Sequence, residues 1–178
     1  MSAVADHAGH AVRRVTGLTE DELHALALVL IDCVAGGASV SFMHPLPLAK
    51  AVAFWRGITA DVARGARALL VAEDAAGIVG TVQLVLAQPE NQPHRADLAK
   101  MLVHRRARRR GLGAALMRAA EATARACGKS VLVLDTAGGD AERLYRRMGW
   151  TPVGTVPDYA LWPQGGLCGT TFFYRRLD

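Results

Sequence analysis

Arginine and glycine are concentrated in one short stretch of the chain. Residues 95–110 contain seven basic residues and one acid, so this stretch carries more positive charge than the whole 178-residue protein, whose formal net charge is +5. Within it, Arg108-Arg109-Arg110-Gly111-Leu112-Gly113 separates an apolar segment from an alanine-rich segment. A helix N-terminus offers free N–H groups and the positive end of a dipole, and glycine lets a phosphate approach the backbone closely. The stretch therefore predicts a site for a phosphate-bearing ligand.

Other nucleotide-binding motifs fit this stretch less well. A dinucleotide fingerprint requires a third glycine where the chain has Leu116, and a Walker loop requires Gly-Lys-Ser/Thr. A nucleic-acid-binding domain that uses residues 105–110 is the alternative of a different class. Against it, no aromatic residue interleaves with the arginines, and nucleic-acid grooves usually spread positive charge over a wider face. We therefore expect no nucleic acid among the partners.

Three further side chains could supply acid–base chemistry. Asp97 lies near the start of the segment that precedes the basic turn. Asp135 directly follows the apolar run 131–134, and Tyr145 lies on a short predicted helix after it. The carboxyl ends of strands are common ligand positions in α/β sheets. Asp97 and Asp135 are candidates to bind an ammonium group or take its proton, and Tyr145 is a candidate proton donor. The structural alternatives are that Asp97 neutralises arginines, Asp135 caps a turn and Tyr145 packs in the core.

The elements that would position these residues follow from hydrophobic periodicity, capping signals and glycine stops. We expect strands at 11–16, 68–73, 78–87, 96–103, 131–134, 151–156 and 170–177, and helices at 19–35, 48–64, 111–127 and 140–148. The apolar run 131–134 is expected to be buried on both faces. This alternation predicts an α/β fold with a mixed sheet. Residues 1–10 are expected to be a flexible N-terminus, and residues 11–178 a single domain.

Composition limits the cellular setting. Hydrophobic residues make up 51% of the chain, which is enough for a sizeable core. Cys33, Cys127 and Cys168 are odd in number and scattered, as is typical of reduced thiols in the cytoplasm. No apolar run reaches membrane-spanning length, residues 1–10 do not resemble a secretory signal, and the histidines lack metal-ligand spacing. We expect a cytoplasmic monomer or homodimer with no bound metal and no membrane partner.

Two signatures in this order resemble the GNAT superfamily of N-acetyltransferases. Residues 108–113 match Arg/Gln-x-x-Gly-x-Gly/Ala, and residues 141–150 match Ala-x-x-Leu-Tyr-x-x-x-Gly-Phe/Trp. The resemblance extends from about Ala11 to the C-terminus. It implies the GNAT acyl-CoA N-acyltransferase fold, in which helices cover both faces of a mixed sheet that splays around CoA. It also implies acetyl-CoA as the cosubstrate and an amine as the acceptor.

The resemblance also implies roles for individual residues. The pyrophosphate of CoA would be held by the backbone of Arg108, Arg109, Arg110, Gly111, Leu112, Gly113 and Ala114. The preceding strand, through Met101, Leu102 and Val103, would pair with the pantetheine arm, and an N–H near Leu102 or Val103 would stabilise the oxyanion. Tyr145 would protonate the departing thiolate.

A narrower resemblance concerns the acceptor. Residues 36–43, 95–103 and 134–136 are similar to those of the tabtoxin resistance acetyltransferases, which acetylate a small β-lactam amino acid. This implies a small-molecule amine as the substrate and a role in antibiotic or toxin resistance, with Ser39, Phe42 and Met43 as candidate substrate-binding residues. This chain has Asp97 where those enzymes have glutamate. The alternatives are acetylation of a protein N-terminus or lysine, and a CoA-binding module without catalysis.

Overall fold

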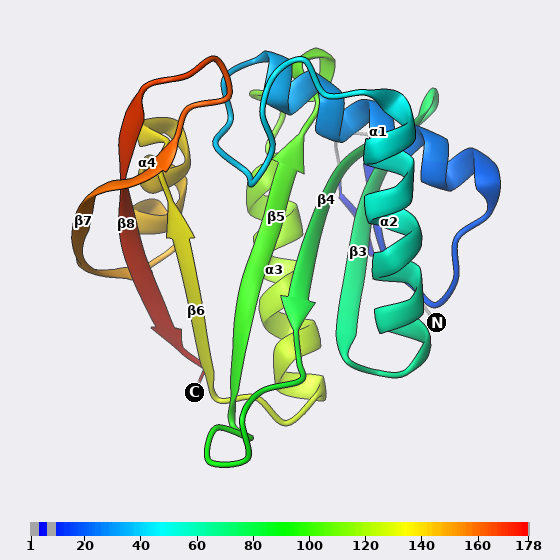
Figure 1. The fold of residues 1–178 in the computed structure, drawn as a ribbon. Coiled ribbons are helices and arrows are strands. Elements are labelled where there is room, and N and C mark those ends of the chain that lie inside the picture. The colour runs from blue at the N-terminus through cyan, green and yellow to red at the C-terminus, as the bar shows by residue number, and fades with distance from the viewer. Residues whose placement is uncertain (1–3, 7–9, 178) are drawn as a thin grey trace.

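The computed structural model describes residues 4–6 and 10–177, which form one mixed eight-stranded sheet with helices on both of its faces. The strand order is β1-β2-β3-β4-β5-β6-β8-β7 (Figure 1). The elements are β1 (Val4–Asp6), β2 (His10–Val15), α1 (Glu20–Ala35), α2 (Leu48–Ala63), β3 (Arg67–Asp74), β4 (Gly77–Val85), β5 (Arg95–Val103), a 3-10 turn (Arg105–Ala107), α3 (Leu112–Ala126), β6 (Val131–Thr136), α4 (Gly139–Arg147), β7 (Thr151–Leu161) and β8 (Leu167–Arg176).

Local sequence signals account for most of these boundaries. The predicted capping box at the start of α1 is confirmed: Thr19 Oγ1 accepts the Glu22 N–H at 3.2 Å, and Glu22 Oε2 accepts the Thr19 N–H at 2.8 Å. Two elements were not predicted. One is the 3-10 turn, and the other is β1, which pairs antiparallel with β2. Strand β1 falls within the segment expected to be flexible, of which residues 1–3 and 7–9 lie outside the described residues.

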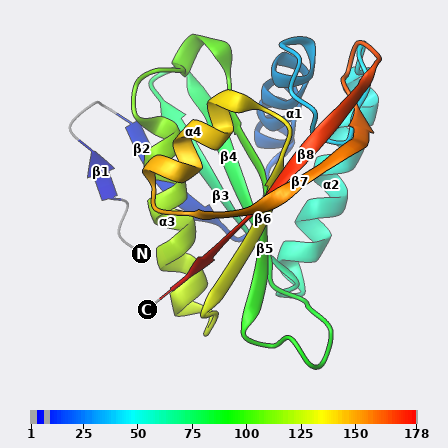
Figure 2. The same cartoon turned by 90° about the vertical axis from the view of Figure 1, so that its left-hand side faces the viewer.

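The helices form two layers, one on each face of the sheet. Helices α1 and α2 cover one face, whereas α3 and α4 lie on the other (Figure 2). Successive side chains of β3 point to opposite faces, so Leu69 and Val71 join the core under α1 and α2, while Leu70 and Ala72 join the core under α3. The expected mixed α/β fold is confirmed. No helix among the described residues is long and apolar enough to cross a membrane.

Strands β5 and β6 run parallel but separate along their length. Residues 95–97 pair with residues 131–133, whereas β5 continues to Val103 and β6 to Thr136 without further pairing between them in the described chain. Figure 1 shows the two strands close at their starts and apart at their carboxyl ends. On its other edge β5 stays paired with β4 as far as Val103. The separation therefore leaves one edge of β5 free for a ligand.

The prediction that residues 131–134 are buried on both faces is wrong. Leu132 and Leu134 are buried, but Val131 and Val133 are only partly buried. Helix α1 packs on β4 and β5 and α2 packs on β3, so neither helix covers the outer face of β6. An apolar run thus occurs here on a strand that has one open face.

Candidate active site

A cleft of about 650 Å³ opens where β5 and β6 separate. The loop after α1, the start of α3 and the inner side of α4 complete its walls. The predicted site residues that line it are Ser39, Met101, Leu102, Val103, Arg108, Arg109, Gly111, Leu112, Gly113, Ala114, Asp135 and Tyr145. Four other predicted site residues, Phe42, Met43, Asp97 and Arg110, are not among the residues that line the cleft.

The start of α3 has the geometry of an anion site. Gly111 is the N-cap residue with φ of 81°, a left-handed conformation that favours glycine, and no described side chain caps the first turn. Two residues later, a Cβ on Gly113 would lie 3.0 Å from Leu144 Cδ2, so a larger residue there would force the Leu144 side chain of α4 to shift. The glycines thus serve different purposes: Gly111 sets the turn and Gly113 permits close packing of α4. The free N–H groups of the first helical turn fit a phosphate.

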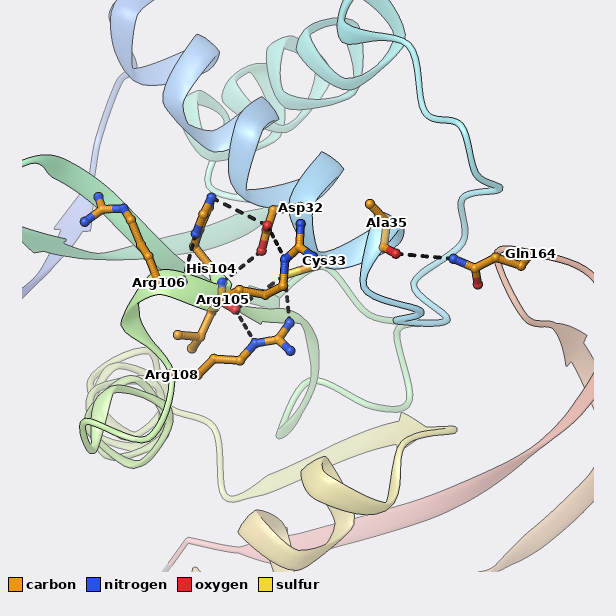
Figure 3. A network of polar contacts seen from close by, with 9 residues as sticks. Asp32, Cys33, Ala35, His104, Arg105, Arg106, Arg108 and Gln164 are labelled. Atoms are coloured by element: carbon orange, nitrogen blue, oxygen red, sulfur yellow. Dashed lines mark hydrogen bonds and ion pairs between the residues drawn. The ribbon is translucent and has the colours of Figure 1, made fainter.

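The structure divides the arginine run into two groups. Arg105 and Arg106 pair with Asp32 and Asp74, and Arg108 Nε donates to the Val103 carbonyl oxygen at 3.0 Å. These three side chains bind the protein itself, as Figure 3 shows for Arg105 and Arg108. The Arg109 side chain is 85% exposed at the rim of the cleft, where it pairs with the likewise exposed Asp140, at 3.8 Å from Nη2 to Oδ1. The positive charge available to a ligand is therefore smaller than the sequence alone indicates.

Asp32 anchors the basic turn to α1. Its carboxylate accepts the Arg105 backbone N–H at 2.8 Å and Arg105 Nε at 2.6 Å, and its side chain is 9% exposed (Figure 3). Burial acts to raise the pKa of Asp32, but the hydrogen bonds from Arg105 and the nearby charge of His104 outweigh it, and the net shift is downward. Asp32 therefore stays ionised and fixes the turn that precedes α3.

Strand β5 contains an irregularity in the cleft, where its pairing with β4 is interrupted. The register between β4 and β5 shifts between Thr81 and Gln83, and Lys100 on the opposite strand has φ of 50°. A β-bulge of this kind redirects side chains and breaks the pairing pattern locally. Met101, Leu102 and Val103 follow it and line the cleft, so their backbone groups can meet an amide-bearing ligand.

Asp135 reaches the cleft from the carboxyl end of β6. Asp135 is exposed to solvent in the cleft, but partial desolvation by the surrounding protein still raises its pKa from the ordinary value; the Lys100 charge opposes this shift and the Asp97 charge adds to it. Asp97 pairs with Val133 in register, and Asp135 is two residues further along β6, so both carboxylates belong to the same face of the sheet. Asp97 itself pairs with Arg95 and accepts Gln88 Nε2 at 3.1 Å. The structure thus brings Asp135 into the cleft and leaves Asp97 beside it.

Tyr145 lies in the last turn of α4, where it both packs in the core and lines the cleft. It is 4% exposed, and its ring lies 5.8 Å from that of Phe173 and 6.1 Å from that of Trp150, centroid to centroid. Burial raises the pKa of Tyr145, and the Asp135 charge raises it further. The phenol is therefore protonated at neutral pH and available as a hydrogen-bond donor.

The loop after α1 closes one end of the cleft and is tied to the β7–β8 hairpin. Ser39 Oγ donates to the Leu161 carbonyl oxygen at 3.2 Å, and Gln164 Nε2 donates to the Ala35 carbonyl oxygen at 3.3 Å. Phe42 instead packs edge-on against Phe54 of α2, and Met43 is 45% exposed. Of the three predicted substrate-binding residues, Ser39 alone lines the cleft.

A sequence profile described as an acetyltransferase (GNAT) domain matches residues 65–152, from the turn before β3 to the start of β7. The match includes the free edge of β5, the start of α3, Asp135 and Tyr145. Residues 65–152 form a GNAT acetyltransferase domain. This match confirms the GNAT fold that the two signatures predicted and, with solved structures of acetyltransferases bound to acetyl-CoA, supports an acetyl-CoA-dependent N-acetyltransferase.

Solved structures of acetyltransferases resemble nearly the whole chain. An N-acetyltransferase from Staphylococcus aureus Mu50 has a TM-score of 0.78 at 16% identity, covering 95% of this chain and 99% of that chain. A GNAT superfamily phosphinothricin acetyltransferase from Sinorhizobium meliloti in complex with AcCoA has a TM-score of 0.76 at 18% identity, covering 95% of this chain and 89% of that chain. A ribosomal-protein-alanine N-acetyltransferase from Brucella melitensis has a TM-score of 0.75 at 24% identity, covering 93% of this chain and 99% of that chain. At these identities the likeness concerns the fold.

Several residues of the GNAT cleft were not found by sequence reasoning. Arg143 and Arg147 line it one helical turn apart on α4, and Trp162 and Lys100 reach it from other elements. The arginine pair could have been found, because residues four apart on a helix share a face. Trp162 and Lys100 gave no such signal, since each depends on a contact between segments distant in sequence.

Changing Gly111 tests the anion site at the start of α3. Gly111→Asp should weaken acetyl-CoA binding at least tenfold, because a carboxylate would compete with phosphate for the N–H groups of the first turn. Gly111→Ala is the matched control: no atom lies within 4 Å of the added Cβ, so this variant has the backbone strain without the charge. Isothermal titration should give the alanine variant an affinity within a few-fold of wild type. Equal weakening by both substitutions would mean that the turn conformation matters and the charge does not.

Proposed function

We propose that this GNAT domain acetylates the primary amine of a small molecule, with Asp135 assisting removal of the amine proton and Tyr145 acting as the acid. The observation that supports this most strongly is the placement of both groups in one cleft. Asp135 enters from β6 and Tyr145 from α4, opposite the free edge of β5 and next to the start of α3. A base, an acid and an anion-binding turn therefore share one space.

The residues on one side of the cleft fit acetyl-CoA, which supplies the acetyl group as an activated thioester. The N–H groups at the start of α3 would hold its pyrophosphate. Arg109, Arg143 and Arg147 would add net positive charge at the rim, since the first two share a single carboxylate, that of Asp140. The free backbone edge formed by Met101, Leu102 and Val103 would pair with the amide groups of the pantetheine arm. A backbone N–H of this edge would donate to the thioester carbonyl oxygen.

Asp135 is the better of the two candidate bases. An amine acceptor is mostly protonated at neutral pH, and a carboxylate of ordinary pKa is a weak base for it. Partial burial raises the pKa of Asp135, the Lys100 charge opposes this and the Asp97 charge adds to it; the net upward shift increases the basicity of Asp135, and its position in the cleft keeps it accessible. Asp97 is engaged by Arg95 and Gln88, so we assign it an electrostatic effect on Asp135 and no contact with the substrate.

Tyr145 would act on the leaving thiolate. Full proton transfer from a phenol to a thiolate is uphill by about 2 kcal/mol at ordinary pKa values, and the raised pKa of Tyr145 makes complete transfer less favourable still. Its role is therefore to donate a hydrogen bond to the sulfur as the carbon–sulfur bond breaks, which stabilises the developing thiolate charge without complete proton transfer. Packing against Phe173 and Trp150 holds the phenol in place for this task.

The sequence around the cleft supports a small acceptor. Residues 36–43, 95–103 and 134–136 resemble the tabtoxin resistance acetyltransferases, and the phosphinothricin acetyltransferase shares the fold. We therefore propose a β-lactam amino acid or a similar toxin as the acceptor and a resistance role in the cytoplasm, where free thiols such as Cys33 and Cys168 persist. A nucleic-acid role is less well supported, because Arg105 and Arg106 are paired with acids.

The release of free CoA thiol from acetyl-CoA tests the acceptor class. Amino acids, β-lactam amino acids, polyamines and aminoglycosides should be compared with peptides that carry a free N-terminus or a lysine. We expect kcat/KM for at least one small amine to exceed that for every peptide by a hundredfold or more. Turnover of peptides above all small amines would contradict the proposal and favour protein acetylation, as in the ribosomal-protein-alanine enzyme.

A further inference from the structure

Lys100 is a cation within the cleft that neither the sequence signatures nor the proposed chemistry uses. It lies at the bulge of β5 and lines the cleft, and its side chain extends toward α2 and the loop after α1. Nζ donates to Ser41 Oγ at 3.2 Å and lies 5.9 Å from the centre of the Phe54 ring. It therefore occupies the face of the sheet to which Asp135 also belongs.

The contact between Lys100 and Ser41 joins two residues with unusual backbones. Lys100 has φ of 50° and Ser41 has φ of 75°, and both values fall in the left-handed region that side chains other than glycine rarely adopt. The two segments are 59 residues apart in sequence. Local strain of this kind persists where the surrounding structure fixes a side chain in place, and it is frequent at ligand sites. Both strained residues line the cleft.

The Lys100 ammonium group has no carboxylate in direct contact among the described residues, and Asp135 and the Phe54 ring compensate its charge only in part. Asp135 acts on this group through space without a hydrogen bond. Burial lowers the pKa of Lys100, Asp135 opposes this effect, and Arg67 lowers the pKa further. An ammonium group has three donors, and Ser41 accepts one of them. A partly buried cation with donors to spare is stabilised by an anion that enters the site.

We propose that Lys100 is a specificity-determining residue that binds an anionic group of the acceptor, so that the preferred acceptor carries a carboxylate or similar oxyanion near its primary amine. This inference rests on the proposed function, because it requires an amine to bind beside Asp135. The ammonium group of the acceptor would face Asp135 while its acid group faces Lys100. The opposite charges on β6 and β5 would then fix both ends of a zwitterion. A simple amine would satisfy Asp135 and leave Lys100 without an anion.

Matched acceptors test this proposal with the wild-type protein. L-leucine, its primary amide L-leucinamide and its decarboxylated form isoamylamine share one side chain and differ at the acid group. The same triplets should be made for any amino acid that reacts. We expect kcat/KM, expressed per unprotonated amine, to be about tenfold to a hundredfold higher for the acid than for either analogue. Amides or simple amines that react as well as the acid would overturn the assignment of Lys100, and the proposed function would stand.

Lys100→Gln and Lys100→Arg locate the source of the preference. Lys100→Gln should raise KM for the acid about tenfold to a hundredfold, change the analogues only a few-fold and leave the Kd for acetyl-CoA unchanged. Lys100→Arg keeps the charge and should retain part of the preference. Equal losses of kcat/KM for the acid and the amide would indicate a merely structural role for Lys100. An increased Kd for acetyl-CoA would place Lys100 in the acetyl-CoA site. Either result would overturn the proposal. If no small amine reacts in any arm, both this inference and the proposed function fail.

Discussion

Replacing Asp135 by asparagine should lower kcat/KM for the acceptor about a hundredfold to ten-thousandfold, the range of effects seen when a general base is removed. Asparagine has nearly the same shape but cannot take a proton. The Kd for acetyl-CoA should stay within a few-fold of wild type, because the anion site at α3 is formed by other residues. Steady-state kinetics at saturating acetyl-CoA and titration of the cosubstrate measure the two quantities separately.

The same substitution should not destabilise the fold. A carboxyl whose pKa is raised in the folded state favours folding only at low pH, and this contribution is lost as the pH rises through the folded pKa. At neutral pH the ionised Asp135 therefore slightly lowers the free energy of unfolding. The Asp135→Asn variant should have a Tm equal to or above that of wild type. Asp97→Asn is the matched control and should reduce activity far less, since Asp97 is paired with Arg95. Full activity in Asp135→Asn would show that the proton leaves by another route.

Replacing Tyr145 by phenylalanine should lower kcat about a hundredfold, the lower end of the range for a positioned acid. Phenylalanine keeps the ring contacts with Trp150 and Phe173, so the Tm and the Kd for acetyl-CoA should remain close to wild type. The loss should appear in kcat and kcat/KM alike, because the hydrogen bond forms only as the thiolate departs.

Tyr145→Leu provides the structural comparison, since it removes both the hydroxyl and the ring contacts. It should lower the Tm as well as kcat. A phenylalanine variant that turns over at the wild-type rate would limit Tyr145 to packing. A phenylalanine variant as unstable as the leucine variant would show that the hydroxyl contributes to the fold and not to the reaction.

The elements of this fold are largely predictable because their signals are local. The capping box at Thr19, the glycine stops and the β3–β4 hairpin are each encoded within a few residues, and the structure confirms them. The splay of β5 and β6 was expected from the resemblance and is confirmed, although no local pattern encodes it. Burial was harder to predict, since the half-open face of β6 depends on where α1 and α2 pack.

The same distinction explains which site residues could be predicted. The start of α3 is a continuous motif, so Gly111 and Gly113 could be placed from sequence alone. The partners of the arginines could not, because Asp32 and Asp74 lie 73 and 32 residues from Arg105 and Arg106. Lys100 was likewise hidden, since its importance arises from a bulge and from a contact with Ser41 in a distant loop.

The pH dependence of kcat/KM for the preferred small amine, compared between wild type and Asp135→Asn, tests the central claim most directly. Protonation of the substrate amine affects both proteins equally, so any difference between the profiles belongs to the enzyme. We predict that wild-type activity falls as the pH drops through the raised pKa of Asp135, and that this additional acid limb is missing in Asp135→Asn. Profiles of the same shape in both proteins would contradict the claim that Asp135 takes the proton of the acceptor in this cleft.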